Sequence, residues 1–203
     1  MDETRRLHPE LCEFISDAIY DGRLRAHPFT KDRVLVLKPA ASPALKPAGV
    51  SFVPVAHAGC KQSSVQEAEA IAELVNDLMR QEVQRGGVLS AITPADILVV
   101  APYNMQVNRL RPCLPKGVQV GTVDKFQGKQ AAVVIVSMTT SRGEDAPRGT
   151  EFLFNPNRFN VGISRAAVMV AYAVHPEHGV LSTCHPDGDL CMQMIQSIVR
   201  GDQ

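Results

Sequence analysis

Four short apolar runs from residue 97 onward constrain the fold of the chain more than any other feature. They are Ile97–Val100, Val118–Val123, Val133–Val136 and Val168–Val174, and helical or polar segments separate them. A strand that is buried on both faces of a parallel sheet is expected to be continuously apolar, without the alternation of a half-exposed strand. Strands that alternate with helices favour an α/β fold with a doubly wound, mainly parallel sheet.

Two segments carry the apolar period of an amphipathic helix. The first begins at Pro9, which suits the first turn of a helix, and is predicted to stop at Gly22. The second begins where Ser64 and Glu67 have the spacing of a capping box, and we expect it to continue up to Gly86-Gly87. The first is therefore predicted to be a short helix and the second a long one.

The length and composition of the chain predict a single folded domain with a short tail. We expect the domain over residues 1–174 and the tail over residues 175–203, with a helix at Leu190–Val199. Residues 38–54 are rich in Pro and Ala, which indicates an exposed connection with short extended pieces. Lys and Arg (21) balance Asp and Glu (21), so net charge neither indicates nor excludes a nucleic-acid partner.

The expected compartment follows from the cysteines and from the apolar runs. The five cysteines include no C-x-x-C pair, which favours reduced thiols over a disulfide framework or a zinc ribbon. No apolar run is long enough to cross a bilayer, and the first residues lack the apolar core of a signal peptide. We therefore expect a cytoplasmic protein with no membrane partner.

Polar clusters flank the apolar runs. They are Ala101–Val107 after the first run, Gly121–Gln130 in and after the second, and Asn157–Ala166 before the last. In an open α/β sheet, ligands bind in the loops that follow the carboxyl ends of the strands. These clusters are therefore the candidate ligand-binding segments.

In this order the three clusters resemble motifs IV, V and VI of superfamily 1 helicases. Residues 4–9, Thr-Arg-Arg-Leu-His-Pro, resemble the arginine-bearing YR-x-HP segment that precedes motif IV in the branch of the nonsense-decay and Dna-two type helicases. The local sequences VGTVDKFQG, EDAPRG and NR-x-NV…SRA are most similar to the C-terminal helicase part of bacterial RecB-like nuclease–helicase proteins.

The resemblance implies the second RecA-like domain of a two-domain motor. Such a domain has the three-layer fold of P-loop NTPases without a P-loop of its own, and it completes an ATP site and a single-strand track. Arg6 and Arg165 match the family's two arginines that reach the γ-phosphate, where a guanidinium stabilises charge during phosphoryl transfer. The implied cofactors are ATP and Mg²⁺, shared with an N-terminal RecA-like domain in cis or in trans.

The same motifs imply the other site residues and the partners. Nucleotide contacts are implied for Gln127, Gly128, Gln130 and Tyr103, and nucleic-acid contacts for Thr122, Lys125, Asn104 and Gln106. The implied partner is a single nucleic-acid strand, with DNA favoured over RNA, and a RecB-like nuclease domain is a further candidate. The chain departs from the family at Gln130, where a glutamate is usual, and at Ala167, where another arginine is usual.

One absence limits what the chain does alone. A P-loop has the sequence G-x-x-x-x-G-K-[ST], but the only Gly-Lys pair, Gly128-Lys129, has Val123 in place of the first glycine and Gln130 in place of the hydroxyl residue. Hydrolysis of ATP by this polypeptide alone is therefore not expected. The alternative is a stand-alone, degenerate helicase half that binds nucleic acid or a protein without turnover.

Structural interpretations compete with the functional ones at several of the site residues. Arg6 and Arg165 are also compatible with ion pairs, and Gln127-Gly128 with a tight turn alone. Tyr103 is compatible with an aromatic cap on the sheet edge, Thr122 with a helix N-cap and Lys125 with a solvated side chain. No metal site is predicted, because the spacing of His175, His178, Cys184, His185 and Cys191 in the tail matches no closed tetrahedral ligand set.

Overall fold

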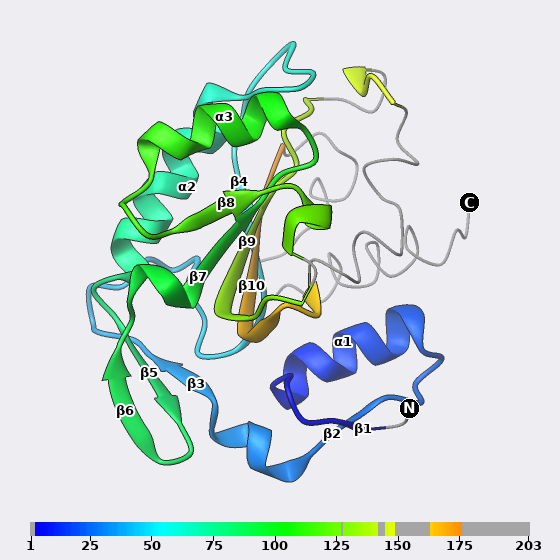
Figure 1. The fold of residues 1–203 in the computed structure, drawn as a ribbon, viewed down its shortest axis with the longest axis vertical. Helices are drawn as coiled ribbons and strands as arrows, with labels where there is room; N and C mark the ends of the chain where they lie inside the picture. Colours follow the sequence, from blue (N-terminus) through cyan, green and yellow to red (C-terminus); the bar gives the residue numbers. More distant parts are fainter. Residues whose placement is uncertain (1–2, 127, 142–144, 149–162, 176–203) are drawn as a thin grey trace.

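A five-stranded sheet forms the centre of the protein in the computed structural model (Figure 1), which describes residues 3–126, 128–141, 145–148 and 163–175. The strand order is β4-β10-β9-β7-β8, and every neighbouring pair is parallel. The strands are β4 (Gly49–Pro54), β7 (Ile97–Val100), β8 (Gln119–Gly121), β9 (Ala131–Ser137) and β10 (Ala166–Val174). The predicted α/β fold with a parallel sheet is confirmed.

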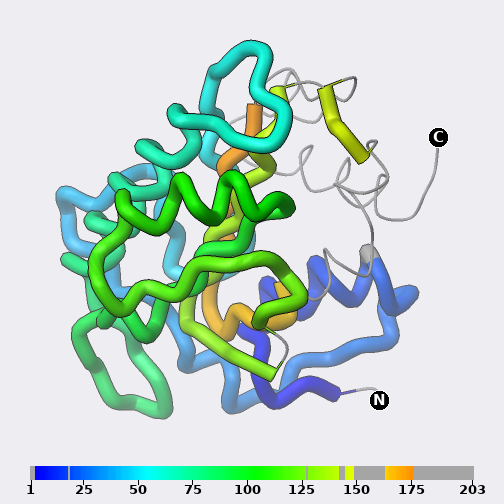
Figure 2. Tube along the Cα trace, turned by 45° about the horizontal axis from the view of Figure 1, so that its top comes forward, coloured from blue at the N-terminus to red at the C-terminus, as the bar shows by residue number. Residues whose placement is uncertain are grey.

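Helices cover both faces of this sheet. Figures 1 and 2 show α1 (Pro9–Ile19) on one side, and α2 (Val65–Leu78) and α3 (Asn104–Cys113) on the other. Along β7, Leu98 and Val100 pack in the core beneath α1, whereas Ile97 and Val99 pack beneath α2 and α3. All four side chains are buried, which explains why the strand is continuously apolar. The result is the three-layer arrangement expected of a RecA-like domain.

The first helix begins and ends as its sequence predicts. Pro9 is its first residue, and the imidazole Nδ1 of His8 accepts a hydrogen bond from the amide of Glu10 at 3.3 Å. Burial lowers the pKa of His8, which favours the neutral ring that this acceptor role requires. After Ile19 the chain turns, and the amide of Gly22 (φ +72°) donates to the carbonyl of Ser16 at 2.9 Å.

The second helix is shorter than predicted. It ends at Leu78, and the chain then forms a hairpin of β5 (Glu82–Arg85) and β6 (Val88–Ala91). Gly86 and Gly87 are its two-residue turn, and their φ angles of +57° and +77° suit a type I′ turn, which glycine favours. A helix continuing up to these glycines is therefore wrong. The strand β3 (Val34–Val36) pairs with β5 to complete a small antiparallel sheet.

Two further boundaries differ from the sequence prediction. Residues 49–54, expected as part of an exposed connection, form β4, which pairs with β10 at the edge of the main sheet. The apolar run from Val118 to Val123 is a strand only at Gln119–Gly121, because the chain then enters a 3₁₀ turn at Val123–Phe126.

The remaining short elements lie near the amino terminus and before β7. They are the parallel pair β1 (Glu3–Thr4) and β2 (Arg25–Ala26), and 3₁₀ turns at Pro28–Asp32 and Pro94–Asp96. The tail and its predicted helix lie outside the described residues, apart from His175. No helix among the described residues has the length and apolar character needed to cross a membrane.

Candidate nucleotide and nucleic-acid sites

Arg6 meets two later segments of the chain at the amino ends of β9 and β10. Its Nη1 donates to the carbonyl of Ser164 at 3.1 Å. With the amide oxygen of Gln130 turned toward Arg6, that oxygen accepts from Nε at 3.2 Å and from Nη2 at 3.1 Å. The resemblance assigns both Arg6 and Gln130 to the nucleotide, and the fold brings these residues together from positions 124 apart in sequence.

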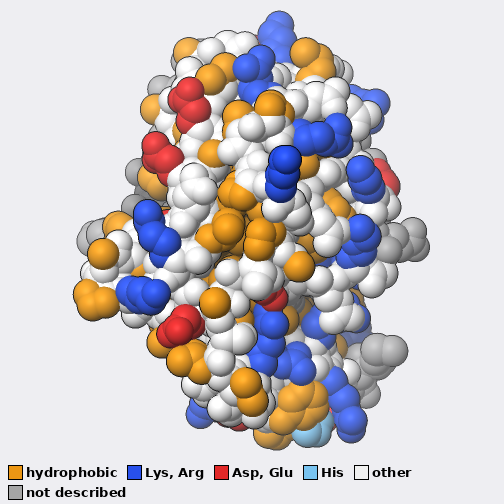
Figure 3. Space-filling view, turned by 60° about the vertical axis from the view of Figure 1, so that its left-hand side comes forward, with side chains coloured by type: hydrophobic (Ala, Val, Ile, Leu, Met, Phe, Trp, Pro, Cys, Tyr) orange, Lys and Arg blue, Asp and Glu red, His pale blue; other side chains and the backbone are white. Residues whose placement is uncertain are grey.

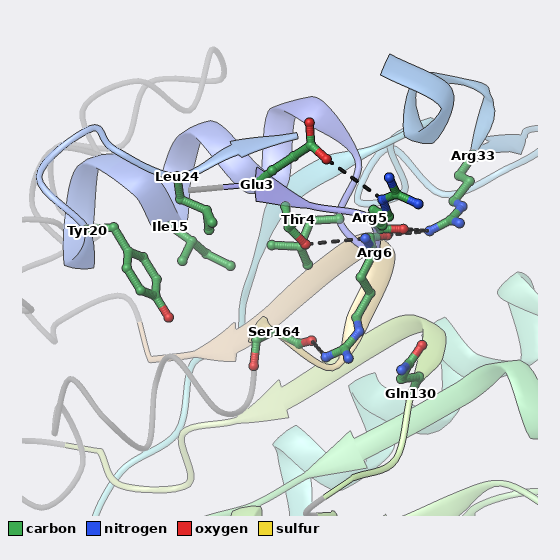
Figure 4. Close-up of a pocket in the computed structure, with 11 residues that line it drawn as sticks. Glu3, Thr4, Arg5, Arg6, Ile15, Tyr20, Leu24, Arg33, Gln130 and Ser164 are labelled. Atoms are coloured by element: carbon green, nitrogen blue, oxygen red, sulfur yellow. Dashed lines mark hydrogen bonds and ion pairs between the residues drawn. The ribbon is translucent and has the colours of Figure 1, made fainter. Parts of the chain in front are cut away.

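Arg6 lies in a pocket of about 630 Å³ that is rich in arginine (Figure 4). Arg5, Arg6 and Arg33 line it, and Glu3 is the only acidic residue among the described lining residues. The Glu3 carboxylate lies 3.8 Å from Arg5 Nε, whereas neither Arg6 nor Arg33 has a carboxylate partner among the described residues. A pocket with this excess of guanidinium groups suits a phosphate or another anion.

The neutral amide of Gln130, in place of the carboxylate of a glutamate, leaves this pocket with a net positive charge. A carboxylate at this distance would form a bidentate ion pair with Arg6, whereas the amide bonds the guanidinium without neutralising it. The positive charge of Arg6 therefore remains available to a ligand.

Arg165 lies at the same edge of the sheet as Arg6. It is the residue before β10, and its carbonyl accepts from the amide of Ala131, the first residue of β9, at 3.0 Å. Its side-chain Nε is buried and has no hydrogen-bond partner within the described part of the chain. A buried donor left without a partner costs about 1–3 kcal/mol, so this nitrogen is suited to an incoming acceptor.

Other predicted site residues lie at the opposite, carboxyl edge of the sheet. Asn104 is the exposed first residue of α3, which follows β7. Thr122 is half-buried directly after β8, and Lys125 is exposed in the 3₁₀ turn that comes next. The rule that ligand segments follow the carboxyl ends of strands does not hold for Gln130, which lies with Arg6 and Arg165 at the amino ends of β9 and β10.

Two predicted contacts do not fit the positions of their side chains. Tyr103 is 6% exposed at the carboxyl edge, it is not among the described residues that line the arginine pocket, and burial raises the pKa of its phenol. The aromatic cap on the sheet edge is therefore the interpretation that the structure favours. Gln106 is fully buried, and its amide bonds the backbone of Ser64 and the hydroxyl of Ser137. A direct contact of Gln106 with nucleic acid is not compatible with this burial.

The turn at Gly128 is partly described. Gly128 has φ +82°, and the amide of Lys129 donates to the carbonyl of Phe126 at 3.0 Å, as in a type II turn. A Cβ on Gly128 would meet nothing within 4 Å, so backbone conformation rather than space requires glycine. The neighbouring Gln127 lies outside the described residues.

The sequence analysis did not predict a buried polar network, because the members of the network are far apart along the chain. Its centre is Glu67, whose carboxylate accepts from the amide of Thr139 at 2.8 and 2.9 Å, from His57 Nε2 at 3.0 Å and from the hydroxyl of Ser137. Half of the predicted capping box forms, because the amide of Glu67 donates to Ser64 Oγ at 3.1 Å. The other half is wrong, since Gln106 accepts from the amide of Ser64.

One face of the protein shows how its charged side chains are distributed. On the face drawn in Figure 3, Lys and Arg side chains are spread among hydrophobic ones and form no continuous patch.

Comparison with known proteins decides the family. The family model described as "AAA domain" matches residues 1–173. The chain belongs to this AAA-domain family. Relatives of the chain include rat "DNA-binding protein SMUBP-2", which is 29% identical over 178 residues, covering 82% of this chain and 17% of the relative.

Two other relatives have helicase in their names. "ATP-dependent helicase upf1" of Schizosaccharomyces pombe is 28% identical over 188 residues, covering 85% of this chain and 19% of the relative. Human "RNA helicase Mov10l1" is 34% identical over 104 residues, covering 48% of this chain and 9% of the relative. The chain thus spans less than a fifth of each of these three proteins. These relatives support the resemblance to the superfamily 1 helicase branch.

Metal ligands do not gather in the described part of the chain. Within it, no group of three or more His, Cys, Asp or Glu residues is placed to hold a metal ion. The tail residues that the sequence analysis considered, His178, Cys184, His185 and Cys191, lie outside the described residues.

Proposed function

We propose that this chain is the C-terminal RecA-like domain of a superfamily 1 helicase. In this proposal it supplies Arg6 and Arg165 to an ATP site whose P-loop belongs to another domain, in cis or in trans. The observation that carries the proposal is the convergence of Arg6, Gln130 and Arg165 at the amino ends of β9 and β10. These are the residues that the helicase motifs assign to the nucleotide.

The chemistry of the pocket fits a nucleoside triphosphate. Arg6 retains its charge beside the neutral Gln130, and Arg165 has a buried Nε that lacks a partner among the described residues. Both features favour a polyphosphate that brings negative charge and acceptor oxygens. Mg²⁺ would be held chiefly by the phosphates and by the P-loop domain, and the arginines of this chain would stabilise charge on the γ-phosphate.

The proposed nucleic-acid track lies at the carboxyl edge of the sheet. Asn104, Thr122 and Lys125 are accessible there, and a lysine and short polar side chains suit the phosphates and sugars of a single strand. The names of the relatives include both DNA binding and RNA, so the proposal is a single strand of either kind. A cytoplasmic location and a RecB-like nuclease partner remain part of the proposal.

The experiment measures strand binding and ATP hydrolysis by the chain alone and by the chain joined to its P-loop domain. Alone, the chain should bind a single-stranded oligonucleotide at low salt without hydrolysing ATP, and the joined protein should hydrolyse ATP in response to the strand.

Lys125→Ala should weaken strand binding and reduce the slope of log K for binding against log salt concentration by about 1.

Lys116→Ala is the matched control. Lys116 is also exposed, but it precedes β8 whereas Lys125 follows it, so the variant removes the same charge from the other end of the strand. Equal losses in the two variants would contradict the proposed track. ATP hydrolysis by the chain alone would contradict the division of the active site between two domains.

A second function has one observation in its favour. Gln130 and Ala167 both depart from the family, and Gln130 hydrogen-bonds to the guanidinium of Arg6, the proposed arginine finger. A stand-alone module that binds nucleic acid or a protein without turnover is the alternative. Absence of hydrolysis in the joined protein, together with retained strand binding, would favour it.

A further inference from the structure

Arg33 contacts the backbone that carries Arg6. It directly follows the 3₁₀ turn Pro28–Asp32, and none of the helicase motifs contains it. Its Nη1 donates to the carbonyl of Arg6 at 2.6 Å and to the carbonyl of Arg5 at 3.1 Å. Figure 4 shows Arg33 reaching these two residues from the side of the pocket.

The segment that Arg33 contacts has little other support. Arg5 and Arg6 follow β1 and lie in neither a helix nor a strand, so no ladder of backbone hydrogen bonds holds them. The other bond at the Arg6 backbone is long, from its amide to Thr4 Oγ1 at 3.3 Å. A single guanidinium nitrogen that bonds two successive carbonyls therefore fixes the direction in which the Arg6 side chain leaves the backbone.

Arg33 is itself held in place. Its guanidinium carbon lies 5.1 Å from the centroid of the Phe29 ring, as in a cation–π contact. Burial, and after it the positive charge of Arg85, lower the pKa of Arg33, although an arginine remains charged at neutral pH. Among the described residues Arg33 has no carboxylate partner. Its guanidinium N–H groups are therefore left to donate to the backbone carbonyls of Arg5 and Arg6 and to line the pocket.

We infer that Arg33 is a positioning residue for Arg6, bonding the backbone so that the finger points at the nucleotide phosphates. The inference rests on the proposed function, because it gives Arg33 a role in the same phosphoryl-transfer site. It predicts that loss of Arg33 acts through Arg6 and not through a separate contribution to folding or to nucleotide affinity.

The test is a double-mutant cycle on ATP turnover in the protein that joins this chain to its P-loop domain. Arg33→Ala should lower kcat by about 10–100-fold, since misplacing a catalytic group by about 1 Å costs that much. KM for ATP should change by less than about threefold. In the Arg6→Ala background, Arg33→Ala should have no further effect, because the group that it positions is already absent.

Two additional variants keep the test interpretable. Arg25→Ala removes an exposed arginine of β2 whose side chain makes no hydrogen bond or ion pair with a described residue, so it controls for loss of surface charge. Arg33→Lys keeps the positive charge and most of the side chain, so it serves as a variant that is expected to fold. Because the lysine ammonium is more compact than the planar guanidinium of arginine and does not reproduce its hydrogen-bond geometry, kcat should still fall by about tenfold. Thermal melting of each variant reports folding separately.

Three outcomes would overturn the inference. A kcat for Arg33→Ala equal to that of Arg25→Ala, with Arg6→Ala inactive, would overturn it and leave the proposed function standing. An equal fold-loss from Arg33→Ala with and without Arg6 would show that Arg33 acts independently of the finger. Normal turnover in Arg6→Ala would overturn the inference and the proposed function together.

Discussion

Arg165→Ala and Arg6→Ala should each reduce ATP turnover, by the protein that joins this chain to a P-loop domain, to a small residual rate. An arginine that stabilises the transferring phosphoryl group contributes about 10³–10⁵ in kcat, so each single variant should lose at least about a thousandfold. The double variant should lose little more, because residues that act on one group are not additive.

The fold should survive both substitutions. Among the described residues, the Arg6 side chain bonds only Ser164 and Gln130, and Arg165 has a buried Nε without a partner. Arg111→Ala, at an exposed position in the last turn of α3, is the matched control and should keep normal turnover. Steady-state hydrolysis and thermal melting check the two halves of the prediction. Turnover within a few-fold of that control, in a folded Arg165 variant, would remove this residue from the mechanism.

Glu67→Ala should destabilise the fold by about 3–5 kcal/mol, because it removes the acceptor of a buried network. The variant leaves the amide of Thr139, the ring of His57 and the hydroxyl of Ser137 without their shared carboxylate. Glu69→Ala is the matched control on the same helix, since Glu69 is exposed, and surface changes of this kind stay within about 0.5 kcal/mol. Urea unfolding of the two variants compares the free energies directly.

The same two variants also test whether the buried network around Glu67 holds the carboxyl edge of the sheet together. Glu67 joins α2 to the loop after β9, at the carboxyl edge where Asn104 and Lys125 also lie. If unfolding shows that Glu67→Ala is as stable as Glu69→Ala, the network does not hold this edge together.

The sheet was largely predictable from the sequence. β7, β9 and β10 lie where the apolar runs predict strands, because a strand buried on both faces needs apolar residues at every position. The end of α2 was not predicted, because the apolar pattern continues past Leu78 and only the paired Gly86-Gly87 indicates a hairpin.

The candidate site was predictable only in part. The resemblance to helicase motifs assigns Arg6, Gln130 and Arg165 to the nucleotide, but pattern alone does not reveal that they meet at the amino ends of β9 and β10. Arg33 and Glu67 could not be identified as parts of sites, since their partners are backbone atoms or distant side chains that only the fold brings near. Tyr103 and Gln106 show the converse, because motif residues also serve the core.

The central claim, that this chain supplies arginines to a shared ATP site, is tested most directly by the structure of the joined protein. The measurement is a crystal or cryo-EM structure with ADP and a γ-phosphate mimic bound. The account predicts that guanidinium nitrogens of Arg6 and Arg165 lie within about 2.7–3.2 Å of the mimic's acceptor atoms. A nucleotide bound with both guanidinium groups pointing away from it would contradict the account.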